Sequence, residues 1–280
     1  MKKLKDITLY ITKNFYDLFI FLYRFLYLHI SNERCQYQST FDRVVHLIGN
    51  GPSASESLPF KGKNQHRFCT VNWMVETDLF ARIKPEYHVV IDPAFFNDTK
   101  KQRVSNFYKL LNLVEWKLTV IVPTEHKSLV RNLVGNKNIS FIGVAINYLP
   151  AKGRFTYLLY KKNFATPKFQ NVIASGIYAF IQLGFKEINL YGVEHDEMSR
   201  FTITSKNEVL LRTSHFYGEA TSNLTKSGKV HPGEFWRFIS NYSSMLKGYA
   251  ELSGYAKHVG VNIVNCTEGS YIDSFLKRSL

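Results

Sequence analysis

The stretch that decides the fold is RVVHLIGNGPS, residues 43–53. It begins as a short apolar run and ends in a turn that contains two glycines and a proline. This pattern is typical of a buried strand followed by a tight turn. Because glycines let the backbone approach a ligand closely, the free N–H groups of this turn are able to cradle a phosphate. A plain strand-to-helix turn is the alternative, since the motif lacks both the G-x-G-x-x-G spacing and the lysine of a P-loop.

Similar apolar runs continue along the chain. Six more segments are predicted to hold buried strands: 66–75, where the strand closes near Asn72, 86–96, where it stops at Asp92-Pro93, and 118–123, 138–144, 186–195 and 260–266. Apolar residues at helical spacing predict helices over 171–185, which opens with a turn at Ala174-Ser175-Gly176, and over 232–257. Strands that alternate with helices predict an α/β fold with a single doubly wound, mostly parallel, Rossmann-like sheet. Such sheets bind ligands beyond the carboxyl ends of their strands.

Composition narrows the class of protein. The chain has 280 residues, of which 45% are hydrophobic and 15% aromatic, and this excludes an intrinsically disordered chain. Three cysteines without C-x-x-C spacing exclude a disulfide scaffold and indicate buried or incidental thiols. The 36 Lys and Arg residues outnumber the 22 Asp and Glu residues. The net charge of +14 favours an anionic partner such as a nucleotide, a phosphate, a nucleic acid or an acidic lipid.

The N-terminal part differs in character from the rest. Residues 15–28 (FYDLFIFLYRFLYL) form an apolar run that is shorter than the roughly 20 residues of a membrane span. Its charged residues, Asp17 and Arg24, form with Lys13 a narrow polar stripe on an amphipathic helix. This helix either packs on the protein's own core or lies in a membrane surface, assisted by the three lysines among the first five residues. Polar residues follow as a linker, so the chain divides into two parts: 1–40, helix and linker, and 41–280, the catalytic domain.

Polar residues gather where the predicted strands end. Asn72 and Asp92 follow two of them, and Glu194-His195-Asp196 follows a third. Three consecutive ionisable residues at such a place are suited to position a sugar, to act in acid–base catalysis or to bind a metal, and a solvated loop is the alternative. Ser175-Gly176 opens an apolar helix, where the serine either caps the helix or contacts a ligand.

Two histidines flank a polar stretch near the C-terminal helix. Residues 219–230 (EATSNLTKSGKV) are predicted to form a mobile lid. His215 precedes this stretch and His231 follows it, with Pro232 at a position that suits the start of a helix. A histidine behind a lid is suited to take a proton from a hydroxyl near neutral pH, and a capping or packing role is the alternative for each.

These motifs, in this order, resemble the bacterial sialyltransferases that build lipooligosaccharide outer cores, and a wider group that includes the archaeal-type hydroxymethylpterin diphosphokinases. The resemblance spans roughly residues 43–270 and rests on GNGPS (49–53), Asn72, Asp92-Pro93, ASGIY (174–178), KEINLYGVE (186–194), SHFYG (214–218) and the helix at His231. It implies a GT-A-like, Rossmann-like domain with a lid. It also implies a metal-independent, inverting glycosyltransferase that moves sialic acid or a related acidic sugar from a CMP donor to a cell-surface glycan such as lipooligosaccharide, O-antigen or capsule.

The resemblance and the strand-end positions together give each candidate residue a role. The donor-binding set is Gly49, Asn50, Gly51, Pro52, Ser53, Asn72, Asp92, Ser175, Gly176, Glu194, His195, Asp196 and Tyr217. His231 becomes the base that deprotonates the acceptor hydroxyl, with His215 as the alternative. The chain departs from the family at Asp92, where the family has Asn, and at Glu194, where it has the first of two tyrosines that stabilise the departing phosphate. Tyr217 is a candidate for one of these tyrosines.

The expected partners follow from this reading. They are a nucleotide sugar, a glycan or glycolipid acceptor and the inner face of the cytoplasmic membrane. No cofactor, metal or nucleic acid is expected. A homo-oligomer is compatible with this interpretation. A pterin diphosphokinase that uses ATP and magnesium is the alternative, with Asp92 and Asp196 as its carboxylate pair. A nucleic-acid-binding module is a third option, supported only by the charge and the aromatic content. The amphipathic helix and the basic charge favour a membrane-side polymer over a soluble pterin.

Overall fold

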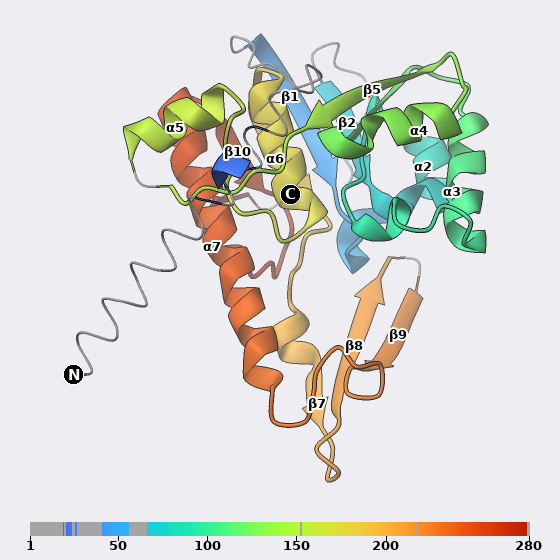
Figure 1. The fold of residues 1–280 in the computed structure, drawn as a ribbon, viewed down its shortest axis with the longest axis vertical. Helices are drawn as coiled ribbons and strands as arrows, with labels where there is room; N and C mark the ends of the chain where they lie inside the picture. The colour runs from blue at the N-terminus through green and yellow to red at the C-terminus, as the bar shows by residue number, and fades with distance from the viewer. Residues whose placement is uncertain are drawn as a thin grey trace.

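A central parallel sheet forms the middle layer of the protein (Figure 1). The computed structural model describes Phe19, residues 21–23, Leu26 and residues 41–55, 66–151, 153–216 and 218–278. Within these residues the sheet has eight strands in the order β11-β10-β6-β1-β2-β3-β4-β5, and every neighbouring pair is parallel. The strands are β1 (Phe41–Ile48), β2 (His66–Val71), β3 (Tyr87–Val89), β4 (Leu118–Pro123), β5 (Ile139–Val144), β6 (Phe185–Tyr191), β10 (Asn262–Asn265) and β11 (Leu276–Lys277). The predicted doubly wound α/β fold is confirmed.

Helices cover both faces of the sheet (Figure 1). One side carries α2 (Asp78–Ile83), α3 (Gln102–Asn112) and α4 (Lys127–Leu133), and the other carries α5 (Arg154–Lys161), α6 (Val172–Gln182) and α7 (Phe235–Val259). Short 3-10 helices are η1 (Pro52–Ser55), η2 (Asn72–Glu76), η3 (Pro93–Phe95), η4 (Thr124–His126) and η5 (Glu197–Arg200). Each face of the sheet therefore has its own hydrophobic core.

Strand β1 contributes to both cores, because successive side chains of a strand point to opposite faces. Val45 and Leu47 are fully buried in the core beneath α6 and α7, and Ile48 is fully buried in the core beneath α2 and α3. A Cβ on Gly176 would lie 3.1 Å from Leu47 Cδ2, so glycine at this position lets α6 approach β1 closely. The apolar run quoted at the outset thus anchors the whole sheet.

The strand order reverses beside β1. From β1 the chain runs outward through β2, β3, β4 and β5, and it then returns to place β6 on the other side of β1. The loops that leave β1 and β6 therefore diverge toward opposite halves of the sheet. In open α/β sheets this switch point is where the ligand crevice lies.

A small antiparallel sheet stands apart from the main sheet (Figure 1). It consists of β7 (Phe201–Ile203), β8 (Val209–His215) and β9 (Gly218–Asn223). The prediction of a mobile lid over 219–230 is therefore wrong for the first half of this stretch, which forms strand β9. The polar residues of this stretch form a strand because their backbone groups pair with β8 from Leu210–Asn223 to His215–Gly218.

Strand β2 ends beside Asn72, as predicted, and strand β3 ends before its predicted stop at Asp92-Pro93. Strand β2 ends at Val71 because Asn72 adopts a left-handed backbone with φ of 49° and opens η2. Strand β3 ends at Val89, and Asp92 caps η3 by accepting a hydrogen bond from the N–H of Ala94 at 2.9 Å. The ends of β2 and β3 thus each bring a polar residue to the edge of the sheet.

Most of the predicted N-terminal helix and linker lies outside the described residues. Of the apolar run, Phe21 is buried in the core beneath α6, whereas Phe19, Leu22, Tyr23 and Leu26 are 47–68% exposed. Cys69 and Cys266 are buried free thiols, as expected. No helix in the described part of the chain combines the length and apolar character needed to cross a bilayer.

Candidate active site

The carboxyl ends of β1 and β6 enclose a cavity of about 160 Å³. The loop after β1 (residues 49–52) forms one wall, and the loop after β6 (residues 192–197) forms another. The first turn of α6 and the end of β8, at His215, complete the lining. The cavity therefore lies at the switch point of the sheet, where this fold holds its ligands.

A second cavity, of about 490 Å³, is lined by residues from the ends of β2 and β3. Its polar lining includes Asn72 and Asp92. Its apolar lining includes Ile91, Ile146 and Phe169. Asn171 and Val172 line both cavities, so the two form one cleft in two parts. The larger part alone has the size of a typical small-molecule site.

The two glycines of the loop after β1 let this loop lie directly against the loop after β6. The N–H of Gly49 donates to the carbonyl of Tyr191 at 2.7 Å. The N–H of Gly51 donates to the carbonyl of Gly192 at 2.9 Å. A Cβ on Gly51 would lie only 2.7 Å from that carbonyl oxygen. The predicted phosphate cradle is therefore wrong for these two N–H groups, because the end of β6 already uses them.

The carboxylate of Glu194 binds the end of the loop that follows β1, at Ser53. Its Oε1 accepts hydrogen bonds from the N–H of Ser53 at 2.9 Å and from the hydroxyl of Ser53 at 2.6 Å. The N–H group of Ser53, which the sequence analysis assigned to a phosphate, therefore already donates to a carboxylate. Ser53 itself does not line the cleft, and it holds Glu194 in place.

Five of the twelve buried side-chain polar atoms that lack a hydrogen-bond partner among the described residues belong to residues that line the cleft. They are Asn50 Oδ1, Asn72 Oδ1, Asn171 Nδ2, Glu194 Oε2 and Glu197 Oε2. An unpaired buried polar atom costs about 1–3 kcal/mol, so these atoms gain most from a polar ligand. Three of them belong to neutral amides, which suit hydroxyl groups and the edge of a base.

Asn171 is a site residue that the sequence analysis missed. Its Oδ1 caps α6 by accepting from the N–H of Ala174 at 2.9 Å, and this fixes its Nδ2 as the unpaired atom. The first N–H groups of a helix have no partner within the helix and carry the positive end of its dipole. Val172 and Ile173 line the cleft with this end of α6. An asparagine directly before a long apolar run was the available signal for the cap.

Ser175 and Gly176 lie deeper than expected. Helix α6 begins at Val172, so the predicted turn at Ala174-Ser175-Gly176 is already helical, because Asn171 starts the helix earlier. The Ser175 side chain is fully buried, and its hydroxyl donates to the carbonyl of Val172 at 2.8 Å. Neither residue lines the cleft in the structure.

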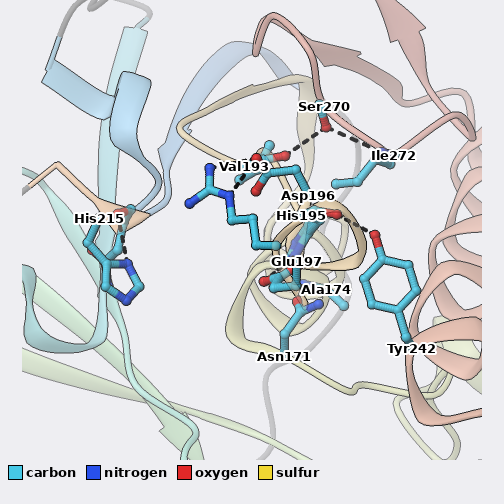
Figure 2. A network of polar contacts seen from close by, with 12 residues as sticks. Asn171, Ala174, Val193, His195, Asp196, Glu197, His215, Tyr242, Ser270 and Ile272 are labelled. Atoms are coloured by element: carbon cyan, nitrogen blue, oxygen red, sulfur yellow. Dashed lines mark hydrogen bonds and ion pairs between the residues drawn. The ribbon is translucent and has the colours of Figure 1, made fainter. Parts of the chain in front are cut away.

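His195 belongs to a chain of hydrogen bonds that links Tyr249 and Asn171, and Figure 2 shows its further contact with Tyr242. Its Nε2 lies 2.8 Å from the hydroxyl of Tyr249, and that hydroxyl donates to Asn171 Oδ1 at 3.0 Å. Because an amide oxygen only accepts, the phenol must accept from His195, whose Nε2 therefore carries a proton. The hydroxyl of Tyr242 also donates to the carbonyl of His195, which has φ of 49°. The network fixes Asn171 at the head of α6.

The other nitrogen of His195 faces a second carboxylate that the sequence analysis missed. Its Nδ1 lies 3.9 Å from Glu197 Oε1. Burial is the largest single influence on Glu197 and raises its pKa, but His195, a backbone N–H group and Arg200 together lower it, so that the pKa lies below its ordinary value. Burial also raises the pKa of Tyr249 well above its usual range, so this phenol stays neutral. His195 is thus engaged on both ring nitrogens.

Asp196 is neutralised within its own loop. Its Oδ2 pairs with Arg200 at 2.5 Å, in the i to i+4 arrangement. Asp92 lines the other cavity and caps η3 with its Oδ1. The two carboxylates of the magnesium alternative are therefore each engaged and line different parts of the cleft. Among the described residues no group of three or more His, Cys, Asp and Glu side chains is arranged to hold a metal ion.

His215 reaches the cleft from the small sheet, apart from the His195 network (Figure 2). Its Nδ1 lies 3.2 Å from the carbonyl oxygen of Asn50. Since a carbonyl only accepts, Nδ1 is the donor in this contact, and in this tautomer Nε2 is the nitrogen able to accept a proton. The contact joins the small sheet to the loop after β1.

The other predicted base lies elsewhere. His231 is exposed and lines neither part of the cleft. Helix α7 begins at Phe235 rather than at residue 232, because residues 231–234 form a turn closed by the Glu234 N–H and the His231 carbonyl at 2.9 Å. His231 is therefore not at the start of the helix. Tyr217 lies outside the described residues.

A buried histidine supports Asn72 from below. His88 is fully buried; its Nδ1 lies 2.8 Å from the hydroxyl of Thr70, and its Nε2 donates to the Asn72 carbonyl at 3.0 Å. Burial lowers the pKa of His88 to about 4. The neutral ring therefore holds the left-handed backbone that turns Asn72 into the cleft.

This pKa predicts an acid-sensitive fold. The folded protein rejects a proton that the unfolded chain binds below pH ~6.5, so stability falls as the pH drops from there toward 4. We expect a loss of about 3 kcal/mol from His88 alone. Urea unfolding at pH 7 and pH 4.5 measures it, and His88→Asn should flatten the difference. The exposed His258→Asn is the control, and equal pH slopes for wild type and His88→Asn would contradict the assignment.

Comparisons with known proteins give a distant likeness. No protein-family model and no curated protein sequence matches the chain. Two solved structures of the sialyltransferase CstII from Campylobacter jejuni are similar to it. The complex with the substrate analogue CMP-3FNeuAc is 16% identical, with a TM-score of 0.45 and coverage of 86% of this chain and 87% of that chain. The complex with cytidine-5'-monophosphate is 15% identical, with a TM-score of 0.46 and coverage of 87% of both chains. A likeness at this level carries no information on the reaction, which the residues of the cleft have to supply.

Proposed function

We propose that the protein is a glycosyltransferase that moves a sugar from a nucleotide donor to a hydroxyl group of a glycan or glycolipid. The observation that carries the proposal is the cleft in two parts, joined at the positive end of α6. A nucleotide sugar also has two parts joined by phosphate. The larger cavity fits the nucleoside, and the smaller one fits the reacting end of the sugar.

The larger cavity offers what a nucleoside needs. Ile91 and Phe169 supply apolar walls for the flat faces of a base. The buried Oδ1 of Asn72 supplies an acceptor for an amino group or a ribose hydroxyl. Cytosine carries such an amino group, which agrees with the CMP donor implied by the sequence resemblance.

The junction of the two cavities suits the phosphate. Asn171 Nδ2 is an unpaired donor, and the first N–H groups of α6 add the positive end of a helix dipole. The charge of the phosphate is thereby met by neutral donors, without a pair of carboxylates to hold magnesium. An acidic sugar would direct its own carboxylate to the same helix end, away from Glu194.

The smaller cavity holds the reacting groups. His215, with its lone pair on Nε2, takes the proton of the acceptor hydroxyl as that oxygen attacks the sugar carbon. The bond from this carbon to the phosphate oxygen breaks, and the nucleotide leaves toward α6. Attack opposite the leaving group gives inversion. Glu194 Oε2 accepts a hydrogen bond from a sugar hydroxyl.

The nucleotide is the first thing to test. We expect CMP to raise the melting temperature of the protein, whereas ATP with magnesium and an oligonucleotide leave it unchanged. Asn72→Ala should weaken CMP binding about tenfold, because it removes one buried hydrogen-bond partner. Asn106→Ala, an exposed site on α3, is the matched control. A response to ATP with magnesium but not to CMP would favour the pterin diphosphokinase. A panel of CMP- and UDP-sugars then identifies the donor.

A further inference from the structure

Helix α5 turns an apolar face outward. Phe155 is 70% exposed and Leu158 is 50% exposed, whereas Thr156 and Tyr160 on the opposite face are buried. Two large apolar side chains side by side on one exposed turn are unusual for a surface without a partner. Figure 1 shows α5 at the outer edge of the molecule, away from the small sheet that borders the cleft.

The described N-terminal residues extend this apolar face. Phe21 is buried in the same core as Tyr160 of α5, and its carbonyl accepts a hydrogen bond from Asn147 at 3.4 Å. Asn147 also donates to the carbonyl of Phe164, just beyond the end of α5. The neighbours of Phe21 are apolar and exposed: Phe19 68%, Leu22 47%, Tyr23 64% and Leu26 64%. The segment is therefore fastened beside α5 with most of its described apolar side chains facing outward.

Basic residues predominate around this face. Residues 145–170 contain no Asp or Glu, and they contain five basic residues: Lys152, Arg154, Lys161, Lys162 and Lys168. One acidic side chain, Glu251 of α7, lies beside this stretch, and burial raises the pKa of its carboxyl group. Arg154 at the start of α5 and Lys161 and Lys162 at its end are exposed and share a helical stripe with Phe155 and Leu158. An exposed apolar pair that is flanked along the helix by basic residues is suited to an anionic lipid surface.

We propose that α5 and the exposed residues Phe19, Leu22, Tyr23 and Leu26 form a membrane-docking face that binds anionic lipid bilayers. The apolar side chains enter the headgroup boundary while the basic side chains contact lipid phosphates. A second copy of the chain fits this face poorly, because it would bring the basic residues of both copies together. Docking here leaves the cleft, bordered by the small sheet, open to an acceptor.

Vesicle sedimentation with the full chain tests the proposal and does not depend on the reaction. Wild type should bind vesicles that contain phosphatidylglycerol, release them at high salt, and leave pure phosphatidylcholine vesicles unbound. The double variant Phe155→Ser/Leu158→Ser should bind at least about tenfold more weakly, because two apolar anchors are lost. Lys161→Gln/Lys162→Gln should also bind about tenfold or more weakly, because each lysine contributes about 1 kcal/mol.

The controls distinguish binding through this face from nonspecific adsorption to vesicles. Leu113→Ser removes a side chain that is 74% exposed at the end of α3, on the other side of the sheet, and should bind as wild type does. Surface substitutions are a cleaner test than deleting residues 1–30, which would remove the core residue Phe21. Equal binding to both vesicle types, or unchanged binding by the Phe155→Ser/Leu158→Ser variant, overturns the proposal. A dimer in solution that this variant abolishes overturns it in favour of a second copy.

Discussion

Replacement of His215 by alanine is expected to lower kcat about 10²–10⁴-fold, the usual contribution of a general base, with little change in the donor KM. The expectation rests on two observations: the side chain lines the smaller cavity, and the Asn50 carbonyl fixes its proton on Nδ1. Steady-state kinetics with the donor and the acceptor measure both constants for the wild type and for His215→Ala.

His231→Ala is the matched control, because this histidine lies outside both parts of the cleft. It should keep near-normal turnover in the same assay. If His231→Ala is inactive and His215→Ala is not, then the base is the one that the sequence resemblance implies. If both variants are active, the His195 network becomes the next candidate.

Gly51→Ala should destabilise the protein by about 3 kcal/mol, the upper end of the cost of overpacking, and abolish CMP binding. The added methyl group would lie 2.7 Å from the Gly192 carbonyl oxygen and would also collide with the Glu194 carboxylate. Glu194 could swing away, but only by breaking its two hydrogen bonds to Ser53. The Gly192 backbone cannot follow, because the N–H of Gly51 is bonded to it. Thermal unfolding and CMP titration measure the two effects.

Gly135→Ala provides the comparison, since an added Cβ there meets no atom within 4 Å. We expect it to change stability by less than about 0.5 kcal/mol, as for most surface substitutions. Similar melting temperatures for both variants would mean that the contact between the two loops tolerates a methyl group. The glycines would then have to be explained by the ligand after all.

Local sequence determined the elements of the main sheet. The apolar runs at 43–48 and 118–123 are strands because a short, uninterrupted apolar segment can be buried only between two covered faces. The polar residues Asn72 and Asp92 were predicted to end the next two strands, and β2 does end beside Asn72, whereas β3 already ends at Val89. The run at 186–195 was predicted too long, because β6 ends at Tyr191, just before Gly192 with its φ of 61°. The small sheet was not predicted, because β9 is polar and mostly exposed and therefore has no apolar pattern. Its backbone pairing with β8 makes it a strand.

The sequence by itself determined that polar and glycine residues collect at one edge of a parallel sheet, because strands of one direction bring all their carboxyl ends together. It also determined which residue types meet there: amides, histidines and carboxylates. Only the tertiary structure decided their roles. The reversal of strand order beside β1 sets the loop after β6 against the glycine loop, and Glu194 then takes the N–H group of Ser53. Likewise, the hydrogen bond from Tyr249 to Asn171 and the distance of His231 from the cleft depend on residues far apart in the chain, whose contacts no local pattern encodes.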